Sequence, residues 1–462
     1  MRSPFLPSLL GLFALAACST PAPQPTDSGA PTDTSDVATD TRAETGADAA
    51  DVPGTDTAPD TAMDVTTDTP ADNPQADVSS EGGTSGMAWC DLPMGPDAMV
   101  RGVTLPAGFC VRRYARLAHP RVMAFSSRGD LFITSPGLTG PGGTGPGISA
   151  IAVLPDDNRD GVADAVSRYA ELTSGVPGFG DFQSVHGILF ANNFMYFSVQ
   201  NGVYRVPFTG TERRVATGVR PEVVADLSDS ERWTHTLAQG PDGTVYVSMG
   251  IYGSSQCPYP SPRRAAVLAI GAGHSTMGDI VARGFRNPMY IRCHAWGCYA
   301  AELTDDGWTA PGREKILRFE NGQDYGYPCC YDRDFPSPAN GGRVMCNTVT
   351  PSLIGFPVGY TPFGHDFAPS GWSGMYAGAL FVGLHGQVGS WNNTGINWAP
   401  VDAATHTPMG ATAQTFMMGW GRGTPNEGRV ADLAFAPDGR LFFTDDQQGH
   451  VYWIAPTTLR VP

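Results

Sequence analysis

The sequence predicts an all-β protein, a six-bladed β-propeller that follows a signal peptide and a disordered acidic linker. Three observations support this prediction: the composition, a repeated hairpin pattern and an abrupt change of composition near residue 86. Glycine (57) and proline (40) are frequent among the 462 residues, and only 16% of the side chains are charged. Turn-rich β proteins have such a composition, whereas helical proteins rarely do.

A hairpin pattern recurs six times in the region 87–462. Each copy has an apolar strand, a turn with Gly, Asp or Asn, and a second strand of alternating apolar residues. The clearest copies begin at Val122, Thr236 and Leu433, and weaker ones begin at Ile188, Met289 and Met375. Aspartate-glycine turns between alternating runs are hairpin signals. Six repeated sheets around an axis make a propeller, and a parallel β-helix would need shorter, more regular repeats.

The two ends of this region can close the ring. The stretch Phe109–Ala115 reads FCVRRYA and is expected to pair with the last strand near Val451–Ile454. Such pairing would complete the last blade with a strand from the start of the domain and close the ring.

Residues 1–18 have the features of an export signal. Arg2 gives a positive start, and Leu9–Ala17 is an apolar run too short to span a membrane. The tetrapeptide LAAC that ends at Cys18 resembles the lipobox of bacterial lipoproteins. The resemblance implies cleavage before Cys18 and its acylation, and Ser19 implies sorting to the outer membrane. Several acyl chains give stable anchoring. The alternative is an ordinary signal peptide with an incidental cysteine.

Residues 19–86 form the predicted linker. They hold 14 acidic residues, one basic residue and no aromatic residue, so they account for 13 of the 16 net negative charges. Such a segment buries too little apolar surface to fold, and its charges keep it extended. Calcium buffering by its aspartates is the alternative role. The region 87–462 is nearly neutral and has no basic stripe, which argues against nucleic-acid binding.

Eight cysteines follow Cys18, and an even number in an exported protein indicates disulfides. Cys293 and Cys298 flank a predicted hairpin turn, so we expect them to form a cross-hairpin bridge. A bridge between Cys90 and Cys110 would fix the entry of the domain. The order of the remaining two bridges stays open among Cys257, Cys329, Cys330 and Cys346. A zinc site is the alternative, but no CxxC pair is present.

An ordered set of motifs resembles a known family. These motifs are LPAGFCVRRYA at 105–115, VHGILF at 185–190, LAQGPDGTVYVSMG at 237–250, GFRNP at 284–288, DYGYPC at 324–329, FVGLHG at 381–386 and GRVADLAFAPDGRLFFTDD at 428–446. Together they are similar to the soluble quinoprotein glucose and sorbosone dehydrogenases. The resemblance covers about residues 104–456. It implies a six-bladed propeller that uses pyrroloquinoline quinone (PQQ) and calcium to oxidise sugars.

The resemblance also implies cofactor-binding residues. Arg286 and Asn287 match an Arg-Asn pair that contacts the cofactor, although alone they could merely shape a turn. Arg429 matches the first of two arginines that bind it, and Ala431 occupies the second position. His385 lies where a cationic residue faces the cofactor. Cations and hydrogen-bond donors suit a tricarboxylate quinone. The family holds its calcium partly by backbone carbonyls, and Thr304 and Asp305 are the nearest equivalents.

The catalytic base is where the sequence departs from the family. Oxidation of an alcohol needs a group that takes the hydroxyl proton. The family's histidine falls here on Arg232 or Trp233, and His235 lies two or three residues further on. His186 is another candidate base, and Gln183 is a further polar candidate near the cofactor. The alternative is that each histidine has only a structural role.

An aspartate-rich loop predicts a second calcium site. Residues 155–164 read PDDNRDGVAD and match the pattern D-x-[DN]-x-D-G-x-x-D. Its ligands would be side-chain oxygens and the carbonyl of Val162, with Gly161 at the sharp turn. The side chains are those of Asp156, Asn158, Asp160 and Asp164. Ser167 replaces the bidentate glutamate of a complete EF-hand, and a plain hairpin turn is the alternative.

Two functions of different classes follow. The first is a PQQ-dependent dehydrogenase that oxidises a sugar or related alcohol outside the cytoplasm and passes electrons to an unidentified acceptor. The second is a non-catalytic propeller lipoprotein that binds a glycan or a protein. A metal-dependent lactonase is a third option, but the sequence lacks an evident inward set of carboxylates. The membrane is expected to be a partner only through the lipid anchor.

Overall fold

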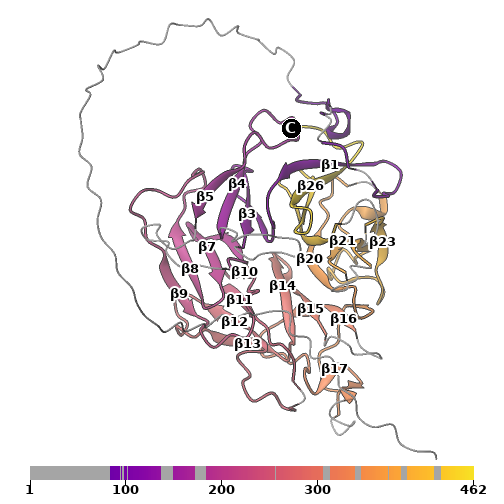
Figure 1. The fold of residues 1–462 in the computed structure, drawn as a ribbon. Coiled ribbons are helices and arrows are strands. Elements are labelled where there is room, and N and C mark those ends of the chain that lie inside the picture. Colours follow the sequence, from indigo (N-terminus) through magenta and orange to yellow (C-terminus); the bar gives the residue numbers. More distant parts are fainter. Residues whose placement is uncertain are drawn as a thin grey trace, which may run out of the picture. The chain divides into compact units, whose positions relative to one another are not determined.

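The structure is a computed structural model. It describes residues 84–93, 95, 98–100, 102–136, 149–171, 184–254, 256–304, 313–338, 345–372, 374–386, 393–420 and 428–462 (Figure 1). The predicted signal peptide, Cys18 and the predicted linker up to residue 83 lie outside these residues, so their roles remain predictions.

Six four-stranded antiparallel sheets make up the described domain, and each is one blade. Blade 1 is β2 (Met123–Phe125), β3 (Leu131–Ser135), β4 (Ala150–Leu154) and β5 (Ser167–Glu171). Blade 2 is β6 (Ile188–Ala191), β7 (Phe194–Val199), β8 (Gly202–Pro207) and β9 (Glu222–Asp226). Blade 3 is β10 (Leu237–Gln239), β11 (Val245–Met249), β12 (Ala266–Ile270) and β13 (Asp279–Arg283).

The remaining blades continue in sequence order. Blade 4 is β14 (Asn287–His294), β15 (Gly297–Leu303), β16 (Glu314–Phe319) and β19 (Ile354–Phe356). Blade 5 is β20 (Pro362–Phe367), β21 (Leu380–Leu384), β22 (Gly395–Ala399) and β23 (Gln414–Met417). Blade 6 is β24 (Val430–Phe435), β25 (Leu441–Asp445), β26 (His450–Pro456) and β1 (Phe109–Arg116). A separate hairpin, β17 (Cys330–Asp332) and β18 (Phe335–Pro336), lies between β16 and β19 of blade 4 in the sequence.

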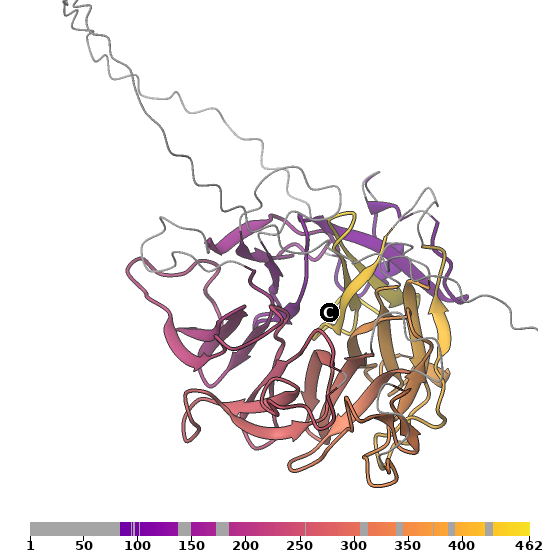
Figure 2. The ribbon, with the colours of Figure 1, turned by 60° about the horizontal axis from the view of Figure 1, so that its bottom comes forward.

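The blades surround a common axis, as Figure 2 shows. The first strand of each blade is innermost, and these strands contact one another in the cyclic order β2, β6, β10, β14, β20, β24 and again β2. The strand β1 pairs with β26, from Phe109 opposite Pro456 to Arg116 opposite His450. The predicted all-β, six-bladed propeller and its closure by the stretch after Phe109 are therefore confirmed.

One predicted hairpin is wrong. The weakest copy was expected to begin with a strand at Met375, but Gly374–Tyr376 is a 3-10 turn, and Met375 is 66% exposed. The innermost strand of blade 5 is instead β20, which lies upstream. A longer connection, anchored by the fully buried Trp372, separates β20 from β21. The sequence shows no tight turn there, so the hairpin pattern does not identify the first strand.

Hydroxyl groups on second strands join blades 1, 2 and 6 to the next blade. Thr134 of β3 accepts a hydrogen bond from the backbone N–H of Val122 and donates to the carbonyl of His186, which precedes β6. Ser198 of β7 likewise accepts a hydrogen bond from Gly187 N–H and donates one to the carbonyl of His235, which precedes β10. Thr444 of β25 accepts from Asp432 and donates to the Arg121 carbonyl, which closes the ring from blade 6 to blade 1. We call these contacts hydroxyl bridges.

Disulfides and the N-terminal segment complete the domain. The predicted bridges Cys90–Cys110 and Cys293–Cys298 are present, and the open pairs resolve as Cys257–Cys329 and Cys330–Cys346. The predicted linker boundary at residue 86 needs a small correction. Gly86 N–H donates to the carbonyl of Val461, and the Thr84 hydroxyl donates to that of Arg159. Thr84 and Gly86, at the end of the predicted linker, therefore already contact the domain.

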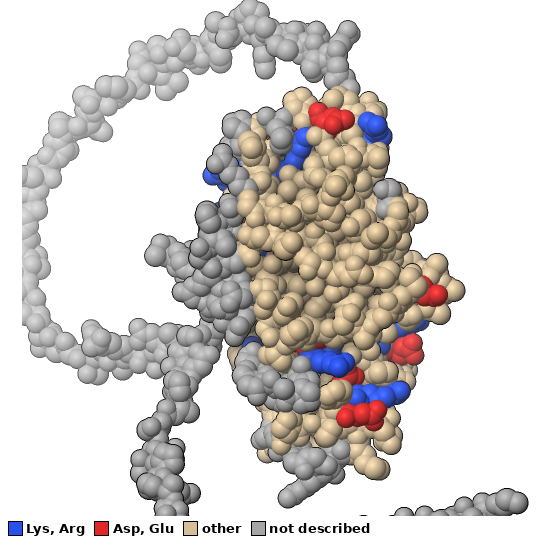
Figure 3. All heavy atoms as spheres, turned by 90° about the vertical axis from the view of Figure 1, so that its right-hand side faces the viewer, with Lys and Arg blue, Asp and Glu red and all other residues tan. Residues whose placement is uncertain are grey.

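Charged side chains on the described surface are sparse and mixed in sign on the face shown in Figure 3. This view agrees with the nearly neutral composition of the region 87–462. Among the described residues, no helix is long and apolar enough to cross a membrane.

Candidate functional site

The residues that precede the innermost strands, and those that follow the second strands, meet at one end of the axis. We call it the site end. At its centre lies Asp446, which directly follows β25 and has 1% of its side chain exposed. Its carboxylate contacts Arg429 Nε at 2.6 Å, Arg121 Nη1 at 2.9 Å and His385 Nε2 at 3.3 Å. These three partners come from blades 6, 1 and 5, and we call the four side chains the Asp446 cluster.

The electrostatics of the Asp446 cluster favour a bound anion. Burial opposes ionisation of Asp446, but Arg121, His385 and Arg429 hold its pKa well below the ordinary value. Burial, with Arg429 beside it, lowers the pKa of His385 to about 4, so this imidazole is neutral at pH 7. Two guanidinium charges therefore face one firmly ionised carboxylate. Burial raises the pKa of the adjacent Asp445 to about 7, so that carboxyl is only partly ionised there.

Arg286 and Asn287 lie at the start of blade 4, and both are 4% exposed. Arg286 donates from Nε to the carbonyl of Tyr252 at 3.1 Å, and its backbone N–H donates to the Glu302 carboxylate. Asn287 packs over Gly250, where an added Cβ would lie 2.3 Å from Asn287 Oδ1. Only glycine therefore permits this approach of Asn287 to the end of β11.

Three buried oxygens at the same end of blade 4 have no hydrogen-bond partner among the described residues. They are Asn287 Oδ1, Glu302 Oε2 and Thr304 Oγ1. Asn287 pairs with Leu303 in the sheet, between Glu302 and Thr304. Burial raises the pKa of Glu302 to about 7, against the opposing charge of Lys315. An oxygen-only donor set of this kind suits a hard cation such as calcium.

No group of three or more His, Cys, Asp or Glu within the described ranges is arranged to hold a metal ion. Asp305, the predicted neighbour of Thr304 at a calcium ion, lies outside those ranges, as does Gln183.

His235 is enclosed by backbone. Its ring has no exposed surface, and its nitrogens lie 2.8 Å from the Ser248 carbonyl and 3.3 Å from the Gln200 carbonyl. An external substrate has no access to either nitrogen in this arrangement. The candidate role of His235 as the base is therefore not supported by its surroundings.

His186 is also fully buried, but one of its nitrogens is unoccupied. Nδ1 lies 3.3 Å from the His235 carbonyl, whereas Nε2 has no partner among the described residues. Burial, followed by the charge of Arg121, lowers the pKa of His186 to about 3, so the ring is neutral at pH 7. With the proton on Nδ1 facing that carbonyl, Nε2 carries a lone pair and can accept a proton.

A series of ring contacts encircles the axis beside the Asp446 cluster, and we call it the axial ring. Its members are Trp233, His186, Tyr290, Phe363 and His385. Centroid distances are 5.3 Å for His186–Trp233, 5.8 Å for His186–Tyr290, 5.5 Å for Tyr290–Phe363 and 4.2 Å for Phe363–His385. The guanidinium of Arg121 lies 5.6 Å from the Trp233 ring, so the axial ring and the Asp446 cluster form one closed circuit.

Arg232 is one of the two positions, with Trp233, at which the family resemblance expects a histidine base. Its guanidinium lies 4.0 Å from the ring centroid of Tyr252, which is 53% exposed, and its Nε donates to the carbonyl of Ile251. A guanidinium remains protonated at neutral pH and cannot accept a proton. Arg232 therefore does not serve as a base, and its stacking on Tyr252 places it at the rim of the site end.

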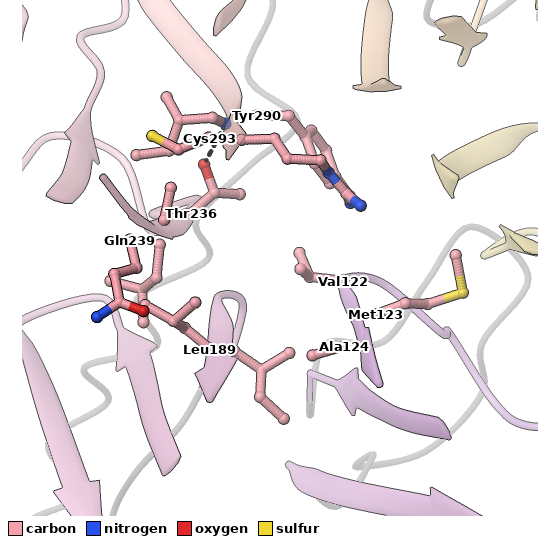
Figure 4. A pocket seen from close by; sticks show the side chains of 13 residues that line it. Val122, Met123, Ala124, Leu189, Thr236, Gln239, Tyr290 and Cys293 are labelled. Atoms are coloured by element: carbon pink, nitrogen blue, oxygen red, sulfur yellow. Dashed lines mark hydrogen bonds between the residues drawn. The ribbon is translucent and has the colours of Figure 1, made fainter. Parts of the chain in front are cut away.

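A cavity of about 290 Å³ lies further along the axis, beyond the axial ring. Residues from the innermost strands of blades 1 to 4 line it, including Ala124, Thr236, Gln239 and Tyr290, as Figure 4 shows. The Thr236 hydroxyl accepts a hydrogen bond from Ile291 N–H, which joins blades 3 and 4 there. We call this space the axial cavity.

The aspartate-rich loop lies at the outer part of blade 1. Asp160 Oδ1 accepts from Val162 N–H at 2.8 Å, Asn158 Oδ1 accepts from Asp160 N–H, and Asp164 accepts from Asp157 N–H. Asp156 lies 3.3 Å from Arg440, and its Oδ1 has no partner among the described residues. Burial raises the pKa of Asp156 to about 6, against the charge of Arg440.

Sequence reasoning missed Arg121, Asp446 and Tyr290. The signal was present in the repeats, because Arg121 precedes its innermost strand just as His186 precedes the next, and Asp446 follows β25 as His385 follows β21. Aligning the six copies by strand would have selected these positions. Arg121 also places a second guanidinium beside Arg429, although Ala431 occupies the second arginine position of the family motif.

Comparison with solved structures identifies the fold. The chain is similar to the PQQ domain of pyranose dehydrogenase from Coprinopsis cinerea, in its holo form, with a TM-score of 0.60 and 17% identity over 77% of this chain and 98% of that chain. The calcium structure of a Trichoderma reesei enzyme of carbohydrate-active family AA12 has a TM-score of 0.59. Its sequence identity is 16%, over 78% of this chain and 99% of that chain. Soluble aldose sugar dehydrogenase from Escherichia coli, in its apo form, has a TM-score of 0.53 and 16% identity over 75% of this chain and 99% of that chain.

The chain therefore has the fold of the soluble PQQ-dependent sugar dehydrogenases. No protein-family model matches it, and no curated protein matches its sequence.

Proposed function

We propose that the protein is a PQQ- and calcium-dependent dehydrogenase that oxidises a sugar, or a related alcohol or aldehyde, outside the cytoplasm. The observation that carries the proposal is the buried convergence of Arg121, Arg429 and His385 on Asp446, at the axis of a propeller with the sugar-dehydrogenase fold. Four disulfides support an oxidising, extracytoplasmic location.

The residues at the site end fit the cofactor chemistry. Arg121, Arg286 and Arg429 would bind carboxylates of the quinone through charge-assisted hydrogen bonds. Asn287, Glu302 and Thr304 have unpartnered buried oxygens that would bind calcium. When bound, the quinone would supply the electron acceptor for the substrate carbon, and calcium would polarise the reacting carbonyl.

His186 is the candidate base in this proposal. Its Nε2 is unpartnered and lies in the axial ring, next to the Asp446 cluster, and the ring is neutral at working pH. It would take the hydroxyl proton of the substrate at Nε2 while Nδ1–H stays directed at the His235 carbonyl. A neutral hydroxyl is a poor donor of electrons, so removal of this proton assists oxidation at the carbon.

Two further parts of the proposal concern calcium and the membrane. The aspartate-rich loop would bind a structural calcium through Asp156, Asn158, Asp160 and Asp164. Acylation of Cys18 would anchor the domain to a membrane. The acylated cysteine and the linker would then hold the site near the membrane.

A second function, a non-catalytic propeller that binds a glycan or a protein, is favoured by one observation. Arg232 stands where the family has its base, and it stacks on an exposed tyrosine instead. In this function the site end would bind an anionic group without oxidising it.

Cofactor titration of the purified protein separates the two functions. We expect PQQ with calcium to bind and give a shifted absorbance, and Arg286→Ala to weaken binding by about 1.5–3 kcal/mol because a charge-assisted hydrogen bond is lost. Arg283→Ala is the control, since Arg283 is 60% exposed and pairs only with Asp324 in the described contacts. Dye reduction with a sugar panel then tests turnover. A protein that binds no PQQ, or binds it without any turnover, refutes the dehydrogenase.

A further inference from the structure

A buried base needs a path for its proton. His186 has no exposed surface, and the rings of Trp233 and Tyr290 pack against it. Nδ1 faces a backbone carbonyl, which accepts a hydrogen bond but does not carry a proton onward. A proton taken up at Nε2 must therefore leave through another polar group near that nitrogen.

Tyr290 is a polar side chain whose ring contacts that of His186. Their ring centroids are 5.8 Å apart, a separation that leaves room for a bridging water between the polar atoms. The Tyr290 hydroxyl is fully buried and has no partner among the described residues. A buried hydroxyl without a partner is costly, so an unoccupied partner position, suited to water, is expected beside it.

Tyr290 also lines the axial cavity, whose lining includes Thr236 and Gln239 (Figure 4). The cavity of about 290 Å³ has room for several waters, each of which takes about 30 Å³ in the liquid. The strands β2, β6, β10 and β14 are the terminal strands of their sheets, so their free backbone edges offer hydrogen bonds to such waters. Ala124 and Gln239, two of the residues that line the cavity, are partly exposed to solvent.

We propose that Tyr290 relays protons between His186 and the axial cavity, so that protons leave at the end of the propeller opposite to the substrate. The proposal rests on the proposed dehydrogenase function. The substrate O–H bond breaks, and its proton binds His186 Nε2. After the product carbonyl has left, Nε2 passes this proton through water to the Tyr290 oxygen, which releases its own proton to water in the cavity. No electrons move in these steps.

The surroundings of Tyr290 suit a relay that stays neutral. Burial, and next the charge of Asp432, raise the pKa of Tyr290 well above its ordinary value. The hydroxyl is therefore not lost as a donor at working pH, and it passes a proton by accepting one while it donates another. Arg292, the next cation along β14, is held by Asp366 at 3.1 Å and by Asp432 at 3.5 Å, so its charge at the cavity wall is compensated.

The experiment compares Tyr290→Phe with the wild type in two measurements. Proton exchange of the His186 imidazole with solvent, followed by NMR in the protein without cofactor, should slow about tenfold or more in the variant. His365 is the internal reference, because it is equally buried and has no contact with Tyr290 in the described structure. In the holoenzyme, kcat should fall and its solvent isotope effect should rise, while KM and PQQ affinity stay unchanged.

A second variant tests the cavity without changing the relay residue. Ala124→Leu places a larger side chain in the axial cavity and should slow His186 exchange in the same way. If His186 exchange is unchanged in both variants, the relay is refuted and protons leave at the site end. If exchange slows as expected but the wild type binds no PQQ, the proton path stands and the dehydrogenase function fails.

Discussion

Asp446 determines the arrangement of the site end at the scale of single residues. It is the fixed anion between two guanidinium groups and an imidazole that come from three blades. Without it, Arg121 and Arg429 would lie side by side in a buried place with uncompensated charge. The Asp446 carboxylate therefore holds the two guanidinium groups together when no ligand is bound. A bound anion then needs to balance only the positive charge that Asp446 does not neutralise.

We predict that Asp446→Asn lowers the free energy of unfolding by about 3–5 kcal/mol, the usual cost of removing one partner from a buried ion pair. Denaturant unfolding measures it. The control is Glu222→Gln, which removes an ion pair with Arg205 whose side chains are 57% and 30% exposed. That change should cost less than about 1 kcal/mol. Equal small effects of both changes would show that Asp446 does not hold the cluster.

His365 makes stability depend on pH. It has no exposed surface, and burial, followed by the charge of Arg292, lowers its pKa to about 3. The unfolded chain binds a proton there near pH 6.5. Between these pH values the unfolded state binds more protons at His365 than the folded state does. The contribution of neutral His365 to the free energy of unfolding is therefore complete above pH 6.5 and is lost as pH falls toward 3.

We therefore expect His365→Asn to reduce the slope of unfolding free energy against pH by about 1.4 kcal/mol per unit between pH 6 and 4. Urea unfolding at several pH values checks this. The carboxyls with raised pKa values, Glu302 and Asp432, act in the opposite direction, but they are present in both proteins and cancel in the difference. Parallel slopes would mean that His365 titrates normally in the folded protein.

Some site residues were predictable from the sequence and others were not. Short motifs identify Arg286, Asn287, His385 and Arg429, because each lies within a recognisable stretch of sequence. Asp446 and Arg121 are 325 positions apart, and only closure of the ring brings them together. The burial of His235 was not predictable either, since it depends on which carbonyls of the neighbouring strands face its ring.

At the scale of strands, the hydroxyl bridges couple blade packing to the site. Each one fixes the carbonyl of a residue just before an innermost strand, and these residues include Arg121, His186 and His235. The approach is close, since a Cβ at Gly187 would lie 2.6 Å from the His235 carbonyl oxygen. The backbone of the site is thereby held by the preceding blade as well as by its own sheet.

We predict that Ser198→Ala destabilises the protein by about 1–3 kcal/mol, because Gly187 N–H and the His235 carbonyl lose a buried partner. Ser275→Ala is the matched control: its hydroxyl also donates to a carbonyl, that of Gly278, but in an exposed turn. It should change stability by less than about 0.5 kcal/mol. Thermal unfolding of both variants gives the comparison. If Ser198→Ala melts at the same temperature as Ser275→Ala, the hydroxyl bridge has no structural role.

Local hairpin signals predicted five of the six innermost strands, since tight turns and alternating residues are properties of a short stretch. The innermost strand of blade 5 was not predicted, because a long connection that packs Trp372 into the core separates the first two strands of this blade. A pattern limited to a few residues contains no information about such a contact.

At the scale of the whole molecule, the aspartate-rich loop contacts the place where the ring closes. The Gly161 carbonyl accepts from Trp453 Nε1 at 2.7 Å, Ala163 N–H donates to the Tyr114 carbonyl, and Arg159 Nη1 donates to Pro462. Blade 1 is thus joined to both β26 and β1. A ligand that orders this loop would stabilise the closure between the first and last blades.

We predict that calcium raises the melting temperature and that Asp160→Ala removes part of this gain. A ligand that binds only the native state stabilises by about 2.7 kcal/mol at a hundredfold excess over its dissociation constant. Scanning calorimetry with calcium or a chelator measures the difference. Asp242→Ala, in the exposed turn after β10, should keep the full response. An unchanged melting temperature after chelation would exclude calcium from both proposed sites.

The closure has a mechanical consequence for a domain held by its N-terminus. A pull on residue 84 would act first on the hydrogen bonds that Gly86 and Met87 form with Val461. Peeling of the segment would then stop at Cys90, because its disulfide to Cys110 passes the load covalently into β1. From there the force would spread along the whole β1–β26 pairing, which forms the outer edge of blade 6.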